Sequence, residues 1–177
     1  MKARFKEYLK SLSRATRESI EYGAKTVKGV AGVHVDDNYI GFVNVYCHDE
    51  NGDLTDELRD AVMIALDDYR AGGVEVKVLP IVKHPVDLTN ITLVVKDDVE
   101  MSSVVDSINL LLTNFLNNYT VSSDFFVSDV ITTIMNSYSS IVVTIDLGDL
   151  DNIKILDNEL VVAGEVDIKY TRLSDWR

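Results

Sequence analysis

The chain has 177 residues, which is enough for one compact domain or two small ones. Hydrophobic residues make up 46% and charged residues 26%, a composition typical of a folded globular protein and not of a disordered chain. The formal net charge is -12, so a nucleic-acid backbone would be repelled unless the basic residues were strongly segregated. We therefore expect no nucleic-acid partner.

Cys47 is the only cysteine, so no internal disulfide is possible and the thiol is expected to pack as a small hydrophobe. The opening residues carry charge throughout, which predicts no secretory signal peptide. No window approaches the ~18 apolar residues of a membrane span. We expect a chain that is made and kept in the cytoplasm, with no membrane span.

Residues 1–29 are expected to form amino-terminal helices. One has an apolar face at residues 5–12, and the second begins near Thr16 and stops at Gly29. The basic residues of this region are Lys2, Arg4, Lys6, Lys10, Arg14, Arg17, Lys25 and Lys28. They fit a solvated helical face, and they also fit docking onto an acidic neighbour.

Residues 30–83 predict a first module with the order β-β-α-β. Alternating strands are expected at 33–35 and 39–48, joined by a turn at 36–38, and a further strand at 74–79. Between them, an apolar face from Leu54 to Tyr69 predicts a helix that is capped by Thr55 or Asp53.

Residues 84–177 predict a second module with the order β-α-α-β-β-β. We place the boundary at 80–85, because Pro80 and Pro85 favour an edge or a crossover. Its first strand spans 86–96 with a bulge near residues 89–90, and two amphipathic helices follow, the first opened by a Ser103 to Asp106 capping pattern. The closing strands are expected at 141–147, 152–156 and 161–170. The predicted fold class is α+β, with two small layered modules, residues 30–83 and 84–177, after the helices of residues 1–29.

Motifs for chemistry are missing. His34, His48 and His84 have no metal-ligand spacing. The acidic run 49–53 lacks the glycine and glutamate of a calcium loop, because Leu54 and Asp60 stand at those positions. No nucleophile motif or phosphate loop is present; Gly29 to Gly32 follow a helix and favour a stop and a turn. We therefore predict no catalytic, cofactor-binding or metal-binding residues, and no enzyme.

Two sets of side chains leave alternatives open. Acidic residues that could pair in a hydrolase cleft, or simply provide solubility, are Asp36, Asp37, Asp67, Asp68, Asp97, Asp98, Asp146, Asp149 and Asp151. Aromatic residues that could anchor an interface are Tyr22, Tyr39, Tyr46, Tyr69, Tyr119, Tyr138, Tyr170 and Trp176, although Tyr69 and Tyr119 end apolar helical faces and fit a core better.

Three segments carry a family resemblance, namely GFVNVY (41–46), GDLTDEL (52–58) and YRAGGVEVKV (69–78). Upstream, residues 13–16 and 23–35 fit the same family, and downstream so does the run from Phe115 to Ile134. Together they resemble the carboxy-terminal part of baseplate J-like proteins, which are wedge components of phage tails and related contractile injection machines. The chain departs from the family at two places. The family often has Arg-Pro where this chain has Arg70-Ala71, and it usually has a glycine near Val121, where this chain has none.

The resemblance implies a structural component of a tail baseplate, located in the virion and assembled in the host cytoplasm. Its expected partners are other baseplate wedge, hub and sheath-type proteins, in an oligomer without cofactors. Family members are longer, so the resemblance also implies a carboxy-terminal fragment or a short version. A small-ligand-binding regulatory module and an acidic-cleft hydrolase remain as alternatives. A dominant cleft with two or more carboxylates would favour the hydrolase. A closed apolar-rimmed pocket would favour the ligand-binding regulatory module, and flat apolar patches would favour the baseplate wedge.

Overall fold

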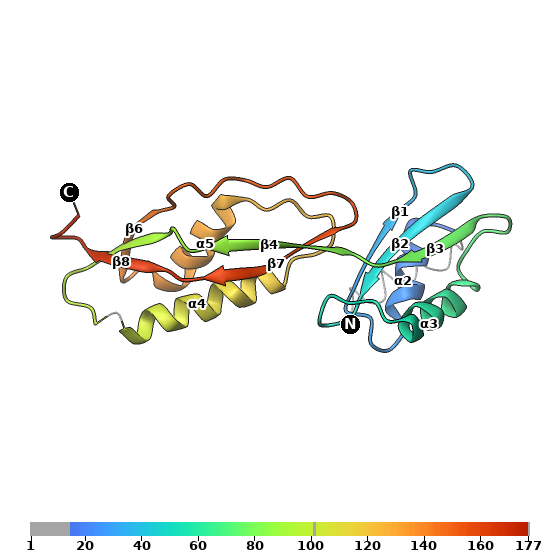
Figure 1. Ribbon diagram of the computed structural model, residues 1–177, viewed down its shortest axis with the longest axis horizontal. Coiled ribbons are helices and arrows are strands. Elements are labelled where there is room, and N and C mark those ends of the chain that lie inside the picture. The colour runs from blue at the N-terminus through green and yellow to red at the C-terminus, as the bar shows by residue number, and fades with distance from the viewer. Residues whose placement is uncertain (1–14, 101, 177) are drawn as a thin grey trace. The chain divides into compact units, whose positions relative to one another are not determined.

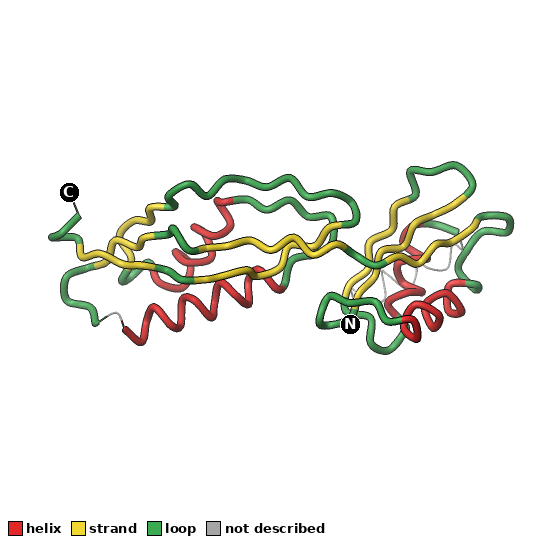
Figure 2. The backbone as a smooth tube through the Cα atoms, in the orientation of Figure 1, coloured by secondary structure: helices red, strands yellow, loops and turns green. Residues whose placement is uncertain are grey.

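The computed structural model describes residues 15–100 and 102–176, and for Ser102 and Ser103 the backbone alone (Figures 1 and 2). The described part holds four helices and eight strands, with 29% of the residues helical and 30% in strands. The predicted α+β class is confirmed. The chain divides into two compact units, Met1–Lys83 with Leu156–Leu160, and His84–Ile155 with Val161–Arg177.

The first unit is built on a three-stranded sheet of β1 (Gly32–Asp36), β2 (Phe42–His48) and β3 (Glu75–Leu79). The central strand β2 pairs antiparallel with β1 and parallel with β3. The parallel pair requires a crossover, which the helix α3 (Asp56–Leu66) provides. Thr55 caps this helix by accepting a hydrogen bond from the Leu58 N–H at 3.2 Å, as the sequence predicts.

Two helices cover one face of this sheet, α3 and α2 (Arg17–Lys25). Thr16 begins α2 with a capping box in which Ser19 is the reciprocal partner. The shared core consists of Ile20, Ala24, Val35, Val45, Cys47, Val62, Leu66 and Val78. The helix α2 therefore belongs to the core of the first unit.

The second unit contains a three-stranded sheet in the order β6 (Val142–Asp146), β5 (Thr92–Val95), β8 (Lys169–Arg172). A two-stranded sheet joins β4 (Val82–Leu88) to β7 (Glu159–Val166). Pro85 lies in β4. Because the sheet of β4 has only two strands, one side of β4 has no hydrogen-bonded neighbour, as expected for an edge strand that contains proline.

The helices α4 (Ser102–Asn117) and α5 (Val127–Tyr138) pack against these strands (Figure 1). Their fully buried residues are Ile108, Leu112, Leu116, Val130 and Ile134, all at positions that the periodicity predicts to be inward. Two asparagines of α4 also hold the last part of the chain. Asn117 accepts from the Ala163 N–H at 3.0 Å, and Asn109 accepts from the Ile168 N–H at 3.1 Å. These bonds satisfy backbone donors at the side of the strands.

Two expected strands are each divided in the structure. The segment 86–96 divides into β4 and β5, with the break at the residues where a bulge is predicted. The segment 161–170 divides into β7 and β8, because the chain changes partners there. The Asp167 N–H donates to the Leu88 carbonyl and the Lys169 N–H donates to the Ile91 carbonyl, so β8 continues along β5.

The expected strand at 152–156 is wrong. Ile153 makes an isolated antiparallel bridge with Phe125, through two backbone hydrogen bonds of 2.9 Å. The next donor in this segment, the Ile155 N–H, donates to the Asp124 carboxylate at 2.8 Å and not to a neighbouring strand. A side-chain acceptor thus replaces the ladder, which is how Asp competes with regular structure.

The helix expected at residues 5–12 lies outside the described residues, as do the side chains of the cap predicted at Ser103. In the described part, no helix is both long enough and apolar enough to cross a membrane.

Candidate functional site

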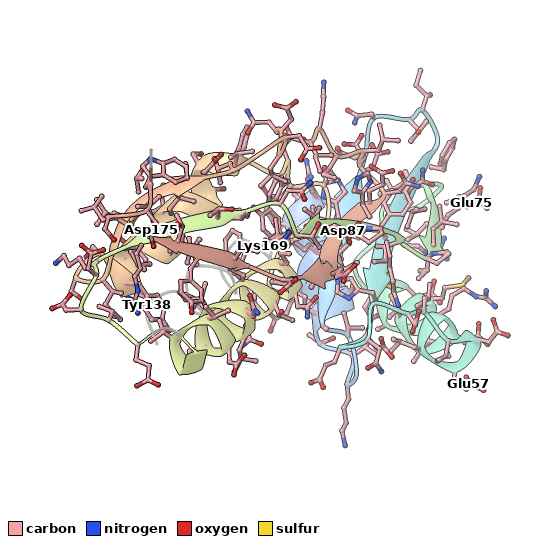
Figure 3. All side chains as sticks on the ribbon, turned by 60° about the vertical axis from the view of Figure 1, so that its left-hand side comes forward. Glu57, Glu75, Asp87, Tyr138, Lys169 and Asp175 are labelled. Atoms are coloured by element: carbon pink, nitrogen blue, oxygen red, sulfur yellow. The ribbon has the colours of Figure 1, made fainter. Side chains whose placement is uncertain are left out.

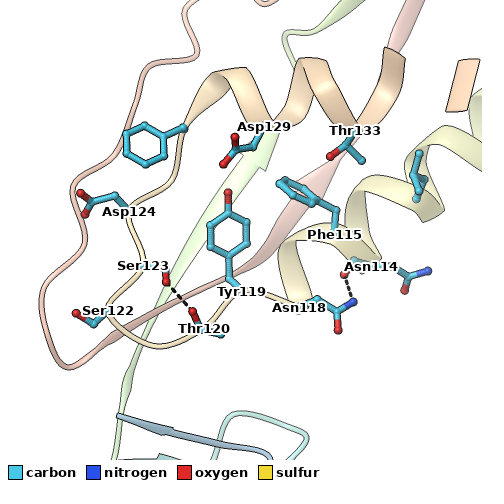
Figure 4. Close-up of a pocket in the computed structure, with 12 residues that line it drawn as sticks. Asn114, Phe115, Asn118, Tyr119, Thr120, Ser122, Ser123, Asp124, Asp129 and Thr133 are labelled. Carbon is cyan, nitrogen blue, oxygen red and sulfur yellow. Dashed lines mark hydrogen bonds between the residues drawn. The ribbon is translucent and has the colours of Figure 1, made fainter. Parts of the chain in front are cut away.

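An open groove in the second unit lies between the last turns of α4, the loop 118–126 and the first turns of α5 (Figure 4). Its volume is about 790 Å³. Aromatic, amide, hydroxyl and carboxylate side chains line it, namely Leu111, Asn114, Phe115, Asn118, Tyr119, Thr120, Ser122, Ser123, Asp124, Phe126, Asp129 and Thr133.

Helical periodicity determines which residues face the groove. Leu112 and Leu116 bury one face of α4, so that Leu111 and Phe115 lie beside that face, next to the groove. On α5, burial of Val130 and Ile134 leaves Asp129 and Thr133, four residues apart, as neighbours on the groove side (Figure 4).

The loop between the helices is held by hydrogen bonds at both of its ends. Thr120 Oγ1 and Ser123 Oγ lie 2.6 Å apart, and Ser122 has a positive φ of 66°, a conformation typical of a tight turn. At the other end, the Val127 N–H donates to the Asn152 side chain at 2.9 Å. The groove therefore has a formed wall between two helices.

Tyr119 lies at the centre of the groove. Its ring contacts Phe115 edge-on, with centroids 5.3 Å apart, and Phe125 at 6.2 Å. Its hydroxyl is buried and has no hydrogen-bond partner among the described residues. Burial raises the pKa of Tyr119, and the charge of Asp129 raises it further. The nearby backbone N–H of Phe126 lowers the pKa of Tyr119, in the opposite direction, although its geometry is not that of a hydrogen bond to the hydroxyl. Figure 4 shows the hydroxyl turned toward Asp129.

The groove contains two carboxylates, which the hydrolase alternative requires, but both have structural roles. Asp124 accepts the Ile155 N–H. Asp129 lies in the first turn of α5, where the helix dipole favours a negative charge. A smaller hollow of about 390 Å³ includes Asp87, Asp149 and Asp151. There Asp87 accepts the Glu165 N–H at 2.8 Å, and Asp149 accepts from the Asn90 side chain at 2.9 Å.

Four of the other acidic residues considered in the sequence have described partners, three of them near in the chain and one distant. Asp36 accepts from Asn38, Asp97 from the Ser174 N–H, and Asp146 from the Gly148 N–H. Asp67 pairs with Arg70 at 2.8 Å. Hydrogen bonds from the Ser174 backbone hold the pKa of Asp97 below its usual range. Figure 3 shows Glu57 and Glu75 pointing outward from the first unit.

The three histidines are not brought together as ligands. His34 is in β1, where burial and then the charge of Arg17 lower its pKa, while His48 ends β2 and makes a 2.7 Å hydrogen bond with the Asp49 carbonyl. His84 is in β4, in the other unit. Among the described residues, no group of three His, Cys, Asp or Glu side chains could hold a metal ion.

The run 49–53 forms an acidic turn. Asp49 accepts from the backbone N–H groups of Asn51 and Asp53, and these bonds lower its pKa. Asp53 pairs with Lys83 at 2.9 Å. Cys47 is fully buried, and burial raises its pKa to about 11, so the thiol is not poised as a nucleophile.

Apolar side chains are exposed at the tip of the β1–β2 hairpin in the first unit. Ile40 is fully exposed beside Tyr39, whose ring stacks on Phe42 with the centroids 4.7 Å apart. Lys77 lies over the other ring of this pair, 4.1 Å from the Phe42 centroid. We call Tyr39, Ile40 and Phe42 the hairpin-tip patch.

Sequence reasoning considered Tyr39 and Tyr119 as aromatic residues, but it did not identify the groove. The polar segment between two apolar helices marks a loop, yet nothing in it shows that the loop closes one end of a hollow. Models of known protein families and the curated proteins contain no match to this chain.

Proposed function

We propose that the chain is a structural component of a phage-tail or related injection-machine baseplate, and that it forms wedge subunits through protein contacts. The family resemblance of residues 41–78 supports this proposal, since it falls on the β2–α3–β3 unit that the first sheet is built around. The corresponding partners are wedge, hub and sheath-type proteins, and the site of action is the tail baseplate of the virion, assembled in the host cytoplasm.

The observation that carries the proposal is the hairpin-tip patch. A fully exposed Ile40 next to a preformed aromatic stack keeps apolar surface in water, at a position that neither unit core requires. Burying an isoleucine side chain contributes about 1.5–3 kcal/mol, and rigid aromatic rings lose little entropy on binding. The patch therefore suits the centre of a protein interface.

The alternatives have less support. A metabolite sensor would surround its ligand, whereas the groove at Tyr119 is open. The hydrolase has one observation in its favour, since Asp124 and Asp129 both line the groove. Its support is smaller because Asp87, Asp124 and Asp149 each accept a hydrogen bond that holds the fold together.

The test is to co-express the full-length protein with the products of its neighbouring genes and to measure the complex by size-exclusion chromatography with mass detection. We expect a complex with sheath-, hub- or wedge-type proteins. Ile40→Asp should weaken it by at least about tenfold, which corresponds to about 1.4 kcal/mol. Ile64→Asp is the matched control, because Ile64 is 75% exposed on α3 of the same unit and lies outside the patch.

Two outcomes would contradict the proposal. One is the absence of any complex when all neighbouring products are soluble. The other is turnover of a sugar or ester substrate by the purified chain, which would favour the hydrolase. If the complex forms and Ile40→Asp leaves it intact, the hairpin-tip patch is not the interface.

A further inference from the structure

The strand β3 has one side of its backbone without a neighbour. It lies at the edge of the three-stranded sheet, whose order is β1-β2-β3 (Figure 1). Its ladder with β2 begins where the Glu75 N–H donates to the Gly41 carbonyl at 3.1 Å. Because backbone groups point alternately to the two sides of a strand, the N–H groups of Val76 and Val78 point away from β2. Among the described residues, none accepts a hydrogen bond from either group. Such an edge is a template for a further strand.

The charged side chains of this edge alternate in sign. Glu75 and Lys77 are on one face of β3, because alternate residues of a strand point to opposite faces and Val78 packs in the core of the first unit. Both are exposed, at 67% of the side chain for Glu75 and 42% for Lys77, and their charged atoms lie 3.8 Å apart. Like charges at these positions would repel a second copy of the strand. Opposite charges two residues apart make the strand complementary to itself once it is turned around.

This self-complementarity selects one antiparallel register, in which Val76 of one copy lies opposite Val76 of the other. Each Glu75 then lies opposite a Lys77 of the second copy. The two Val76 residues exchange N–H to C=O hydrogen bonds, since both groups point outward. The Val78 N–H meets the carbonyl of Val74 in the second copy. The register therefore satisfies both outward donors of each strand, whereas a register with Lys77 opposite Lys77 would set two ammonium groups against each other.

Apolar surface continues from this edge onto α3. A hollow of about 230 Å³ lies between α3 and β3 and is lined by Met63, Leu66, Asp67, Arg70, Glu75 and Val76. Met63 is 47% exposed. Because the two-fold axis of an antiparallel strand pair is perpendicular to the sheet, the α3 helices of both copies cover the same face, and their hollows meet beside the axis. Methionine adapts to irregular gaps, so the two Met63 side chains suit this space.

We propose that two copies of the chain associate by antiparallel pairing of their β3 strands, with Val76 at the two-fold axis, so that their three-stranded sheets become continuous. Ion pairs between Glu75 of each copy and Lys77 of the other fix the register. The contact uses the same surface on both copies and closes on itself, so it produces a dimer and not a filament. This inference goes beyond the proposed function, because it requires no other baseplate component.

The main experiment reverses these charges in the full chain and measures self-association by sedimentation equilibrium. Salt at about 0.15 M, with a Debye length of about 8 Å, screens the net charge of -12 on each copy. Glu75→Lys and Lys77→Glu each set like charges opposite one another, so each should weaken the dimer by about tenfold or more. The double variant, Glu75→Lys with Lys77→Glu, has opposite charges in each pair again and should recover the dimer.

Mixing the two single variants is the sharpest part of this experiment. Each variant associates weakly with itself, but Glu75→Lys paired with Lys77→Glu brings opposite charges together, so the mixture should form a heterodimer. Glu57→Lys is the matched control, because it changes the net charge as Glu75→Lys does. Glu57 is an exposed residue of α3 that does not line the hollow and points outward in Figure 3, so this variant should dimerise as the wild type does.

Amide hydrogen exchange in the wild-type chain, followed by NMR, locates the contact without any substitution. The N–H groups of Val76 and Val78 should exchange at least about tenfold more slowly when the chain is mostly dimeric than when it is mostly monomeric. Amides on the outer side of β1, at the opposite edge of the same sheet, should exchange equally in both states.

Three results would overturn the inference. The first is a wild-type chain that stays monomeric at about 1 mM, the weakest affinity considered for such a contact. The second is a pair of single variants that do not associate when they are mixed. The third is a dimer that leaves the Val76 and Val78 amides unprotected. These assays use one chain alone, so their outcome is separate from whether the multi-subunit complex forms.

Discussion

At the scale of single residues, the two buried groups with the clearest consequences are the Tyr119 hydroxyl and the Cys47 thiol. Both are removed from water. The Tyr119 hydroxyl is a hydrogen-bond donor without an acceptor, whereas the Cys47 thiol is only a weak donor and packs as a small hydrophobic group. Their substitutions should therefore change stability in different ways.

Tyr119→Phe should raise the free energy of unfolding by about 1 kcal/mol, because a buried hydroxyl without a partner carries a desolvation cost of about 1–3 kcal/mol. Tyr46→Phe is the matched control. The Tyr46 hydroxyl accepts from Asn44 at 3.4 Å, so its removal should be neutral or lower stability by up to about 1 kcal/mol. Urea denaturation measures both, and a loss of stability in Tyr119→Phe would show that the hydroxyl has a partner.

Cys47 should make stability depend on pH in the alkaline range. The folded-state pKa is raised to about 11 from an ordinary value of 9.0, so the unfolded chain ionises first as pH rises. The thiol's contribution is complete below pH 9.0 and is lost as pH rises through about 11. Relative to Cys47→Ala, the wild-type chain should lose about 2–3 kcal/mol between about pH 8 and about pH 11, at about 1.4 kcal/mol for each unit of pKa. A constant difference between the two proteins, measured under reducing conditions, would contradict this.

At the scale of elements, each helix is held by one apolar face. Leu66 of α3 is 1% exposed and Leu112 of α4 is 0% exposed, so their predicted burial is confirmed. The polar side chains of α4 have a separate role, because Asn109 and Asn117 accept backbone donors from the last part of the chain. One helix thus covers the core and also satisfies neighbouring backbone groups.

Leu66→Ala and Leu112→Ala should each lower the free energy of unfolding by about 2–5 kcal/mol, the range for large-to-small changes in a core. Leu110→Ala is the control on α4, since Leu110 is 62% exposed, and it should change stability by less than about 0.5 kcal/mol. Chemical denaturation with circular dichroism measures the three variants. Equal effects at Leu110 and Leu112 would mean that the inward face of α4 is assigned wrongly.

At the scale of the whole molecule, the chain has two cores, each enclosed by its own helices and sheet. Acidic residues are distributed over both units, and where their contacts are described they accept hydrogen bonds, some local and some from distant segments, or form exposed ion pairs. Exposed pairs contribute little to stability. The electrostatic consequence of the acidic surface therefore concerns association more than folding.

Calcium, zinc and magnesium should leave the melting temperature unchanged at about millimolar concentration, since a ligand specific for the native state would raise it by mass action. The reason is that the described residues bring no three His, Cys, Asp or Glu side chains together. Differential scanning fluorimetry, with a chelator as the reference, measures this. A saturable rise with one ion would revive the hydrolase alternative.

Periodicity and caps predicted the elements correctly wherever the two signals agreed. Thr55 and the apolar face of α3, the alternation of Val43 and Val45, and the glycines after Arg70 predicted the β-α-β unit. The inward positions of α4 and α5 were equally readable, because burial on one face imposes a 3.6-residue period. These are local properties, which the order of residues encodes directly.

The ends of the strands and the position of the groove depend on packing between distant segments. The Ile155 N–H donates to the Asp124 carboxylate, and at residues 167–169 the backbone pairing changes from β4 to β5. In both segments the alternation of apolar residues alone favours a continuing strand. The groove likewise requires α4, α5 and the loop 118–126 in fixed positions. Which donor meets which acceptor across tens of residues depends on packing, and the local pattern does not carry that information.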